Sequence, residues 1–506
     1  MFRTIVISWL TLATIALGGA ASCDNNAATN CCGATCAAPT ACPSDQTCNS
    51  AGVCEAKPIV DAGVDAAQGC MKDADCTNVG APVCNNTAQN PVGVCVQCTP
   101  SNDSACNGGT PVCGADFACH GCTTHAECGD DSACVMTGPM AGSCTDPSTT
   151  FHVNATGSVT ADCTTAATAC NTITRVLQVL PAAGASVLAS GAINEPGEVV
   201  IDSVSFALYG SGAATTSFKR AMRTGFGVFS LLGTAQVDFY DLAITDSARC
   251  LSIRNTATTL TRTTFVCGDI SVESPSGGDL TLSHATISGA NSEAIAKVGG
   301  KVLIADSTIA NNGLGIRVTG GSLGVARSTF TGNRFGAITI TGNGSFDIQN
   351  SLIVRNGSAS GTVPAMTLAT TGPNNKLLFN TIAENVMTTS MFSPRTSAAV
   401  VCTVSAGNLT EGYNLLYRNV RDGVALLSEQ QQGTCIGATS YANVDALNPL
   451  QFVNPTTAPY DYHLTAGSPT TVLNVAGANC AGMVDFDGQM RPSGGACDLG
   501  ADELHP

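Results

Sequence analysis

One short phrase recurs about every 22 residues through the second half of this 506-residue chain. A representative copy is Val302-x-Ile-x-Asp-Ser-Thr-Ile309, in which apolar and polar residues alternate as in a half-buried strand. The last apolar residue of each copy anchors the repeat, and the successive anchors are Ile244, Phe265, Ile287, Ile309, Phe330, Ile353, Ile382 and Leu416. One repeat cannot bury its apolar face alone, so the repeats must stack. The period therefore predicts an all-β coil, a β-solenoid.

Asparagine follows the later anchors at a fixed distance of three residues. These positions are Asn312, Asn333, Asn356, Asn385 and Asn419. Asparagine tolerates the backbone conformation of a bend, and successive parallel strands lie about 4.8 Å apart. Each amide can therefore reach the equivalent amide of the next turn. We expect a structural asparagine ladder along the coil.

A short helix is expected where the coil begins, because residues 170–180 carry apolar residues at helical spacing and Pro181 follows. Such a helix would cover an open strand edge. Over roughly residues 155–420 the sequence resembles the right-handed parallel β-helix family, whose fold is that of pectate lyases. The resemblance implies a single-stranded right-handed parallel β-helix, which we place at residues 150–420. A shared fold does not identify an activity.

The front of the chain is similar to a bacterial lipoprotein signal. A positively charged start and an apolar run precede the sequence Ala20-Ala21-Ser22-Cys23. We expect residues 1–22 to be a signal peptide and Cys23 to receive a lipid, with ordinary cleavage after Ala21 or Ser22 as the alternative. The protein would then be exported and held at a membrane by its anchor, at the outer membrane or cell surface of a bacterium, or else secreted.

The chain has 27 cysteines, and such density in an exported protein predicts disulfides. Residues 23–54 would hold the anchor region and a first four-cysteine module, residues 55–69 an Asp/Ala linker, and residues 70–146 three tandem modules. Zinc also uses the Cys-x-x-Cys spacing that joins the tandem modules, but an oxidising compartment favours bridges. Elsewhere, candidate pairs are Cys163 with Cys170, Cys250 with Cys267, Cys402 with Cys435, and Cys480 with Cys497.

The net charge of −16 argues against nucleic acid as a partner, because no basic stripe offers the contacts that phosphates need. Polyanionic pectin would also be repelled by the chain as a whole. The partners that we expect are the membrane, through the lipid, and a glycan or protein ligand.

A column of polar residues stands three positions before the anchors. Its members are Asp241, Arg262, His284, Asp306, Arg327 and Asn350. The alternating charges could form a binding stripe, or His284 beside Asp306 could form an acid/base pair, with Arg327 as a further catalytic candidate. The favoured interpretation is structural: polar residues face water at a bend, and opposite charges relieve repulsion between turns. The sequence lacks the combination of clustered aspartates and a His-Gly motif that polygalacturonases need. It also lacks the clustered calcium ligands of pectate lyases.

The last part of the chain, residues 421–506, loses the period and is expected to form a cap. Asp485-x-Asp487-Gly488-x-x-Arg491-Pro492, followed by Cys497-Asp-Leu-Gly-Ala-x-Glu503, resembles the closing segment of the choice-of-anchor Q family of bacterial surface β-helix proteins. Asp485, Asp487 and Asp498 could bind calcium. We favour instead a pairing of Arg491 with an acidic neighbour, and assign no metal or cofactor.

These observations favour an exported envelope lipoprotein that displays a β-helix for binding or structural purposes without catalysis. The alternative is a polysaccharide lyase or glycoside hydrolase on the same coil. Binding of a protein ligand by the cysteine modules themselves is a further possibility.

Overall fold

The computed structural model describes residues 46–48, 54–56 and 65–505, apart from 79, 88–89, 130, 137–139, 182, 222–226, 247, 389–396, 405–407, 428–429, 445–449, 478 and 494. The expected signal peptide, the lipid site Cys23 and most of the Asp/Ala linker lie outside the described residues. The chain divides into two compact units, Met1–His120 and Gly121–Pro506. The domain limits drawn from the sequence stay predictions. Within the described residues, no helix is both long and apolar enough to cross a bilayer.

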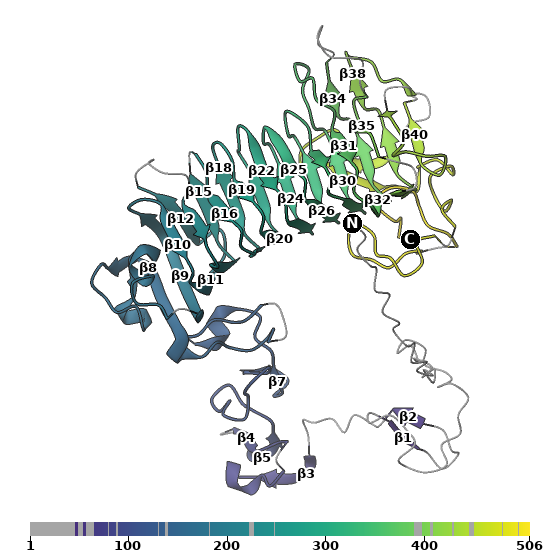
Figure 1. The fold of residues 1–506 in the computed structure, drawn as a ribbon. Helices are drawn as coiled ribbons and strands as arrows, with labels where there is room; N and C mark the ends of the chain where they lie inside the picture. The colour runs from purple at the N-terminus through teal and green to yellow at the C-terminus, as the bar shows by residue number, and fades with distance from the viewer. Residues whose placement is uncertain are drawn as a thin grey trace, which may run out of the picture. The chain divides into compact units, whose positions relative to one another are not determined.

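The second unit is a coil whose turns stack as three parallel sheets (Figure 1). The first sheet contains β8 (Thr150–Ser158), β9 (Ala183–Glu195), β11 (Ser205–Gly210), β14 (Gln236–Tyr240), β17 (Thr258–Thr261), β20 (Asp279–Ser283), β23 (Lys301–Ala305), β26 (Ser322–Ala326), β29 (Phe346–Gln349), β32 (Asn375–Leu378) and β36 (Leu409–Gly412). The second contains the end of β9, then β12 (Thr216–Arg220), β15 (Ala243–Asp246), β18 (Thr264–Cys267), β21 (Thr286–Ser288), β24 (Thr308–Ala310), β27 (Thr329–Thr331), β30 (Leu352–Val354), β33 (Thr381–Ala383), β37 (Leu415–Tyr417) and β40 (Tyr441–Asn443).

The third sheet contains β10 (Val199–Asp202), β13 (Phe229–Leu232), β16 (Leu251–Arg254), β19 (Val272–Ser276), β22 (Glu293–Val298), β25 (Leu314–Thr319), β28 (Ile338–Gly342), β31 (Met366–Thr370), β35 (Val400–Cys402) and β39 (Gln431–Gln432). A short parallel pair, β34 (Val386–Met387) with β38 (Val420–Arg421), extends the last turns. The predicted all-β parallel β-helix is confirmed.

The anchors of the repeat fill the centre of the coil. Ile287, Ile309 and Phe330 occupy equivalent positions in β21, β24 and β27 and are fully buried. Burying one such side chain stabilises the fold by about 1.5–3 kcal/mol before entropy is counted. Because the same contact recurs in each turn, most of the stability resides in the stack rather than in any single turn.

The expected helix at residues 170–180 is shorter than the sequence predicts. Helix α1 covers only Ile173–Val176, and Thr172 caps it by accepting a hydrogen bond from the Arg175 amide. After the helix, the Gln178 and Val179 amides bond three residues back, to Arg175 and Val176, as in 3₁₀ turns. Helix α1 packs against β8 and β10, near the first turn.

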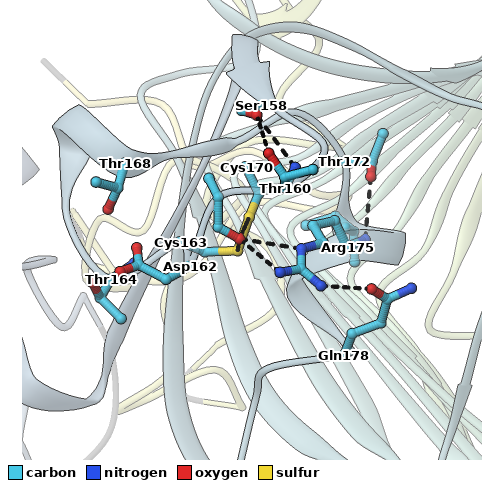
Figure 2. The surroundings of a disulfide bond; sticks show 12 residues. Ser158, Thr160, Asp162, Cys163, Thr164, Thr168, Cys170, Thr172, Arg175 and Gln178 are labelled. Carbon is cyan, nitrogen blue, oxygen red and sulfur yellow. Dashed lines mark hydrogen bonds between the residues drawn. A yellow bond between two sulfur atoms is a disulfide. The ribbon is translucent and has the colours of Figure 1, made fainter.

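A disulfide lies beside this helix, between Cys163 and Cys170 (Figure 2). The Arg175 guanidinium donates from Nε and Nη2 to the Ala161 carbonyl, at 3.1 and 2.9 Å, and from Nη1 to Gln178 at 2.8 Å. Arginine, disulfide and helix cap thus tie together the segment that opens the coil.

The chain after β40 folds back along the side of the coil. A hairpin of β41 (Phe452–Asn454) and β42 (Asp461–Leu464) begins this segment. Its apolar residues form a second core with the outward-facing residues of the last turns, a set that includes Leu352, Val354, Phe379, Leu415, Tyr417, Phe452, Tyr462, Leu464 and Val472. In β21 and β27 the outward residues of the second sheet are threonine and serine, whereas β30 carries leucine and valine. The switch from polar to apolar residues marks where the cap covers the sheet.

The front of the chain contains small disulfide-linked modules. Their short elements are β1 (Gln46–Cys48), β2 (Cys54–Ala56), β3 (Asp65–Cys70), η1 (Asp73–Asp75), β4 (Val83–Thr87), β5 (Asn90–Val96), β6 (Val112–Cys113), β7 (Cys119–His120) and η2 (His125–Cys128). The turn η3 (Pro147–Thr149) leads from the last module into β8, and η4 (Ala166–Thr168) follows β8 in the coil. In each tandem module the first cysteine bonds the third and the second bonds the fourth, as in Cys70–Cys84, Cys76–Cys95, Cys98–Cys113, Cys106–Cys119, Cys122–Cys134 and Cys128–Cys144. The Cys-x-x-Cys cysteines are therefore engaged in disulfides.

The third of these modules belongs to the second compact unit, where it packs on the first turns of the coil. His125 lies edge-on to Tyr209, which stacks on Tyr240 of the next turn. Ala133 completes this small apolar cluster. The module therefore covers part of the first sheet at its beginning.

Candidate functional site

A column of left-handed residues runs up the coil between the first and second sheets. It comprises Asp241, Arg262, His284, Asp306, Arg327 and Asn350, all with φ between 45° and 54°. This is the column that stands three residues before the anchors. A positive φ is strained for a long side chain such as arginine. The bend imposes it, and it turns the side chain outward.

Arginine and aspartate in this column pair across adjacent turns. Arg327 donates from Nε and Nη2 to the two oxygens of Asp306, both at 2.7 Å, and Arg262 grips Asp241 in the same way at 2.6 and 2.7 Å. The hydrogen bonds that Arg327 donates to Asp306 raise the pKa of Arg327 despite partial burial. Such two-point pairing is geometrically specific. Both carboxylate oxygens of Asp241 and of Asp306 are therefore engaged by arginine.

His284 is not assembled with Asp306 as an acid/base pair. Its Nδ1 lies 2.9 Å from the Ser283 hydroxyl, and among the described residues no hydrogen bond or ion pair joins it to Asp306. The structure thus brings Asp306 and Arg327 together and leaves His284 apart. Of the three catalytic candidates, two form an ion pair typical of a structural contact.

A groove of about 950 Å³ opens on the first sheet beside this column. Its floor includes Leu303 and Gly324, which are neighbours in the register of β23 and β26. A side chain at Gly324 would come within 2.7 Å of the Leu303 methyl, so glycine keeps the floor low. Gly482, Met483 and Val484 of the cap form one wall.

The charged residues of the groove are mostly cations. Lys301, Arg327 and Lys376 line it together with one carboxylate, Asp347. Lys376 donates to Asp347 at 3.1 Å. Three cations thus line a groove on a protein of charge −16, although Arg327 and Lys376 are paired with Asp306 and Asp347.

A second hollow, of about 540 Å³, lies on the third sheet. Asp269, Glu293, Arg317 and Phe335 contribute to its lining. Arg317 donates to Glu293 at 2.9 Å, and Phe335 is 40% exposed. The carboxylate Glu293 is again held by an arginine.

The predicted asparagine ladder is present as a continuous chain of amides. Each Nδ2 donates to the Oδ1 of the next residue, at 2.7–3.0 Å, through Asn312, Asn333, Asn356, Asn385 and Asn419. Gln430 accepts from Asn419 at 2.8 Å and ends the ladder. All of these side chains are buried, so the ladder is structural and offers nothing to a ligand.

A second ladder escaped the sequence reasoning. It runs two residues before the anchors through Ser307, Ser328, Ser351, Asn380 and Asn414. The recurring serine in the repeated phrase was its signal. Each hydroxyl or amide oxygen accepts from a backbone N–H of the preceding turn, which leaves the bend without orphaned donors.

The disulfide candidates of the coil and cap are joined as proposed from the sequence. Bonds link Cys163 to Cys170, Cys250 to Cys267, Cys402 to Cys435, and Cys480 to Cys497. Together with the bonds of the modules, they indicate an oxidising compartment and hence an exported protein.

Buried charges concentrate in the cap. Arg491 is 2% exposed and donates to the carbonyl oxygens of Asp498, Gly500 and Ala501 at 2.6–3.2 Å, and to Glu503 at 3.4 Å. It also lies over the Phe379 ring, 4.9 Å from its centre. Arg491 therefore joins the end of the chain to the last turns of the coil.

The three aspartates considered for calcium are not grouped. Both oxygens of Asp498 accept backbone hydrogen bonds, from Asn474 and Leu504. One oxygen of Asp485 accepts from the amides of Asp487 and Gln489. The carboxylates of Asp485 and Asp498 thus order turns of the cap.

Part of the coil matches a known family model. Residues 227–382 and 268–437 match a family model described as a right-handed beta helix region. Similar solved structures include a pectate lyase (14% identity, 70% of this chain and 96% of that chain, TM-score 0.42). Others are the catalytic domain of an α-1,3-glucanase in complex with nigerose (10%, 61% and 69%, 0.29) and a periplasmic alginate epimerase (10%, 48% and 74%, 0.26). No curated sequence matches the chain. The coil is right-handed, and these distant likenesses say nothing about its activity.

Proposed function

We propose that this protein is an exported bacterial envelope lipoprotein, anchored through Cys23, whose β-helix binds a glycan without cleaving it. The observation that carries the proposal is the occupation of the surface carboxylates by arginine and lysine. Asp306 is held at two points by Arg327, and Asp347 by Lys376.

Hydrolysis of a glycosidic bond usually requires two carboxyl groups free to exchange protons or to attack the sugar. Both oxygens of Asp306 are instead engaged in hydrogen bonds from Arg327. The basic candidate His284 has a serine rather than a carboxylate as its partner. These contacts favour binding over hydrolysis, and the lyase alternative is left to the test below.

The groove on the first sheet has the features of a glycan site. It is long and open, it presents hydroxyls and amides such as Thr281 and Gln349, and Leu303 offers an apolar patch on which a sugar ring can lie. The lysines add donors for hydroxyl or carboxylate oxygens. We propose this groove as the place where the ligand lies.

The test is binding and product release measured on one panel of glycans. Protein with Cys23→Ser should bind at least one glycan and release neither reducing sugar nor unsaturated uronate. Gly324→Leu, which fills the floor, and Lys376→Ala should weaken binding by about tenfold or more, equivalent to about 1.4 kcal/mol. Lys219→Ala, an exposed lysine outside the groove, is the matched control. Release of product that Asp306→Ala or His284→Ala abolishes would establish the lyase or hydrolase instead.

The anchor is tested separately. Labelled palmitate should enter the protein in a bacterial host and should be absent from Cys23→Ser. Labelling that persists in this variant would remove Cys23 as the lipid site, without affecting the proposed groove.

A further inference from the structure

Three segments of the cap bring one histidine and two aspartates together. His463 lies on β42, Asp487 in the turn after Asp485, and Asp502 near the end of the chain. One ligand atom from each lies within 4.8 Å of the other two. Among the described residues this is the one such group in which no cysteine takes part.

The His463 ring is held by one nitrogen and presents the other toward the group, as is common for histidines that bind metals. Its Nδ1 lies 2.5 Å from Asp461 Oδ1, which fixes the ring and directs Nε2 toward Asp487 Oδ2, 3.0 Å away. Nε2 is buried and forms no hydrogen bond of good geometry. A carboxylate that holds the far nitrogen of a histidine is the usual support of a zinc-binding imidazole.

The second aspartate is held in place from behind. Asp502 is 5% exposed, and its Oδ2 accepts from the Leu464 amide at 2.6 Å. Among the described residues no arginine, lysine or histidine lies within ion-pair distance of it. A buried carboxylate in such surroundings calls for a positive charge.

Among the described residues, buried carboxylates outnumber buried cations in this region, and His463 and His505 face Asp487 and Asp485. Asp485, Asp498, Asp502 and Glu503 are each at most 5% exposed, and Arg491 is the buried cation that faces them. Asp485 has an oxygen, Oδ2, that accepts no hydrogen bond, with His505 Nε2 3.4 Å away. Each buried carboxylate that lacks compensation costs several kcal/mol. A bound cation would supply the positive charge that these buried carboxylates need.

We propose that His463, Asp487 and Asp502 bind a divalent transition-metal ion of the zinc class. An imidazole nitrogen with two carboxylates suits zinc, whereas calcium takes oxygen ligands alone. The ion would fasten β42 to the turn at Asp487 and to the chain end. This site is independent of the glycan groove and of catalysis.

The test is a titration of metal-free protein with Zn²⁺ against a chromophoric chelator. The protein is the full chain with Cys23→Ser, in which all remaining cysteines can pair, and it is first shown by thiol titration to have no free thiol. One Zn²⁺ should bind per chain, and the cap should become more resistant to proteolysis. Ca²⁺ at the same concentration should not produce this protection.

Matched variants locate the site. His463→Ala should abolish the binding, and Asp487→Asn, at an exposed position that folding tolerates, should weaken it at least tenfold. Asp461→Asn should weaken it by about 10–100-fold through loss of the ring's support. His120→Ala removes a histidine that also faces an aspartate, Asp116 at 2.8 Å, but has no second carboxylate. This control should bind normally.

Several results would overturn the proposal. They are absence of zinc binding, equal binding by the Asp487→Asn variant, or a response to calcium with none to zinc. In each case the acidic cluster would be balanced by protons alone or by an oxygen-seeking ion.

Discussion

The interior of the coil and the cap bury polar groups by opposite means. Along the ladder, neutral amides repeat with the turns, and each Asn side chain finds the same partners above and below. In the cap, charges are buried once each, in contacts without repetition, around Arg491. A repeated neutral contact tolerates the loss of one member better than a single buried charge does, because removing a cation leaves its carboxylates without compensation. The comparison predicts that the cap is the more vulnerable region.

The largest effect is expected from Arg491→Leu. The variant should lose about 3–5 kcal/mol of cap stability, since Glu503 and its acidic neighbours would keep buried charges without a cation. Limited proteolysis and thermal melting should show the cap opening before the coil. Arg317→Leu, which breaks the more exposed pair with Glu293, is the control and should cost about 1 kcal/mol or less. Equal losses in the two variants would refute the special role of buried charge.

The second effect is expected in the ladder. Asn356 is fully buried and donates to the Phe330 and Val354 carbonyls and to Asn385, while accepting from Asn333. Asn356→Ala should therefore cost about 2–4 kcal/mol, because several buried groups lose partners at once. This loss in the free energy of unfolding is measured by chemical denaturation.

The control for the ladder is Asn343→Ala, at an exposed turn, which should be within about 0.5 kcal/mol of the parent. If Asn356→Ala changed the free energy of unfolding as little as this control does, the buried amides would not contribute to the stability of the coil.

The contrast between the two regions also explains what the sequence could predict. A repeat can be recognised in a sequence because its residues recur at fixed distances. The anchors, Asn333 and its equivalents, and the column at Asp306 and Arg327 could all be predicted in this way. The serine ladder through Ser328 was equally periodic. The cap has no period: His463, Asp487 and Asp502 come from three segments that meet only in the folded chain. The groove depends on a similar distant contact, because Met483 forms its wall.

Lys297 breaks the neutral pattern of the interior and was missed for that reason. It occupies the inward column of the third sheet beside Val318, with which it pairs in register, and is 2% exposed. Its ammonium donates to Ser274 at 3.0 Å, to the Gly278 carbonyl at 2.8 Å and to the Gly277 carbonyl. Burial lowers the pKa of Lys297 to about 8, and Asp279 opposes the shift.

The smallest effect is expected from titrating this lysine. Its pKa is lower in the folded chain than in the unfolded one, so above pH 8 unfolding takes up a proton. Stability that depends on Lys297 should therefore rise between about pH 8 and pH 10, by at most about 1.4 kcal/mol per pH unit. Lys297→Met should lack this rise, and the difference between the two proteins, measured by denaturation at several pH values, isolates it. A parallel pH response in both would mean that the carbonyls of Gly277 and Gly278 keep the ammonium charged, and that the coil accommodates a buried cation as readily as the cap does.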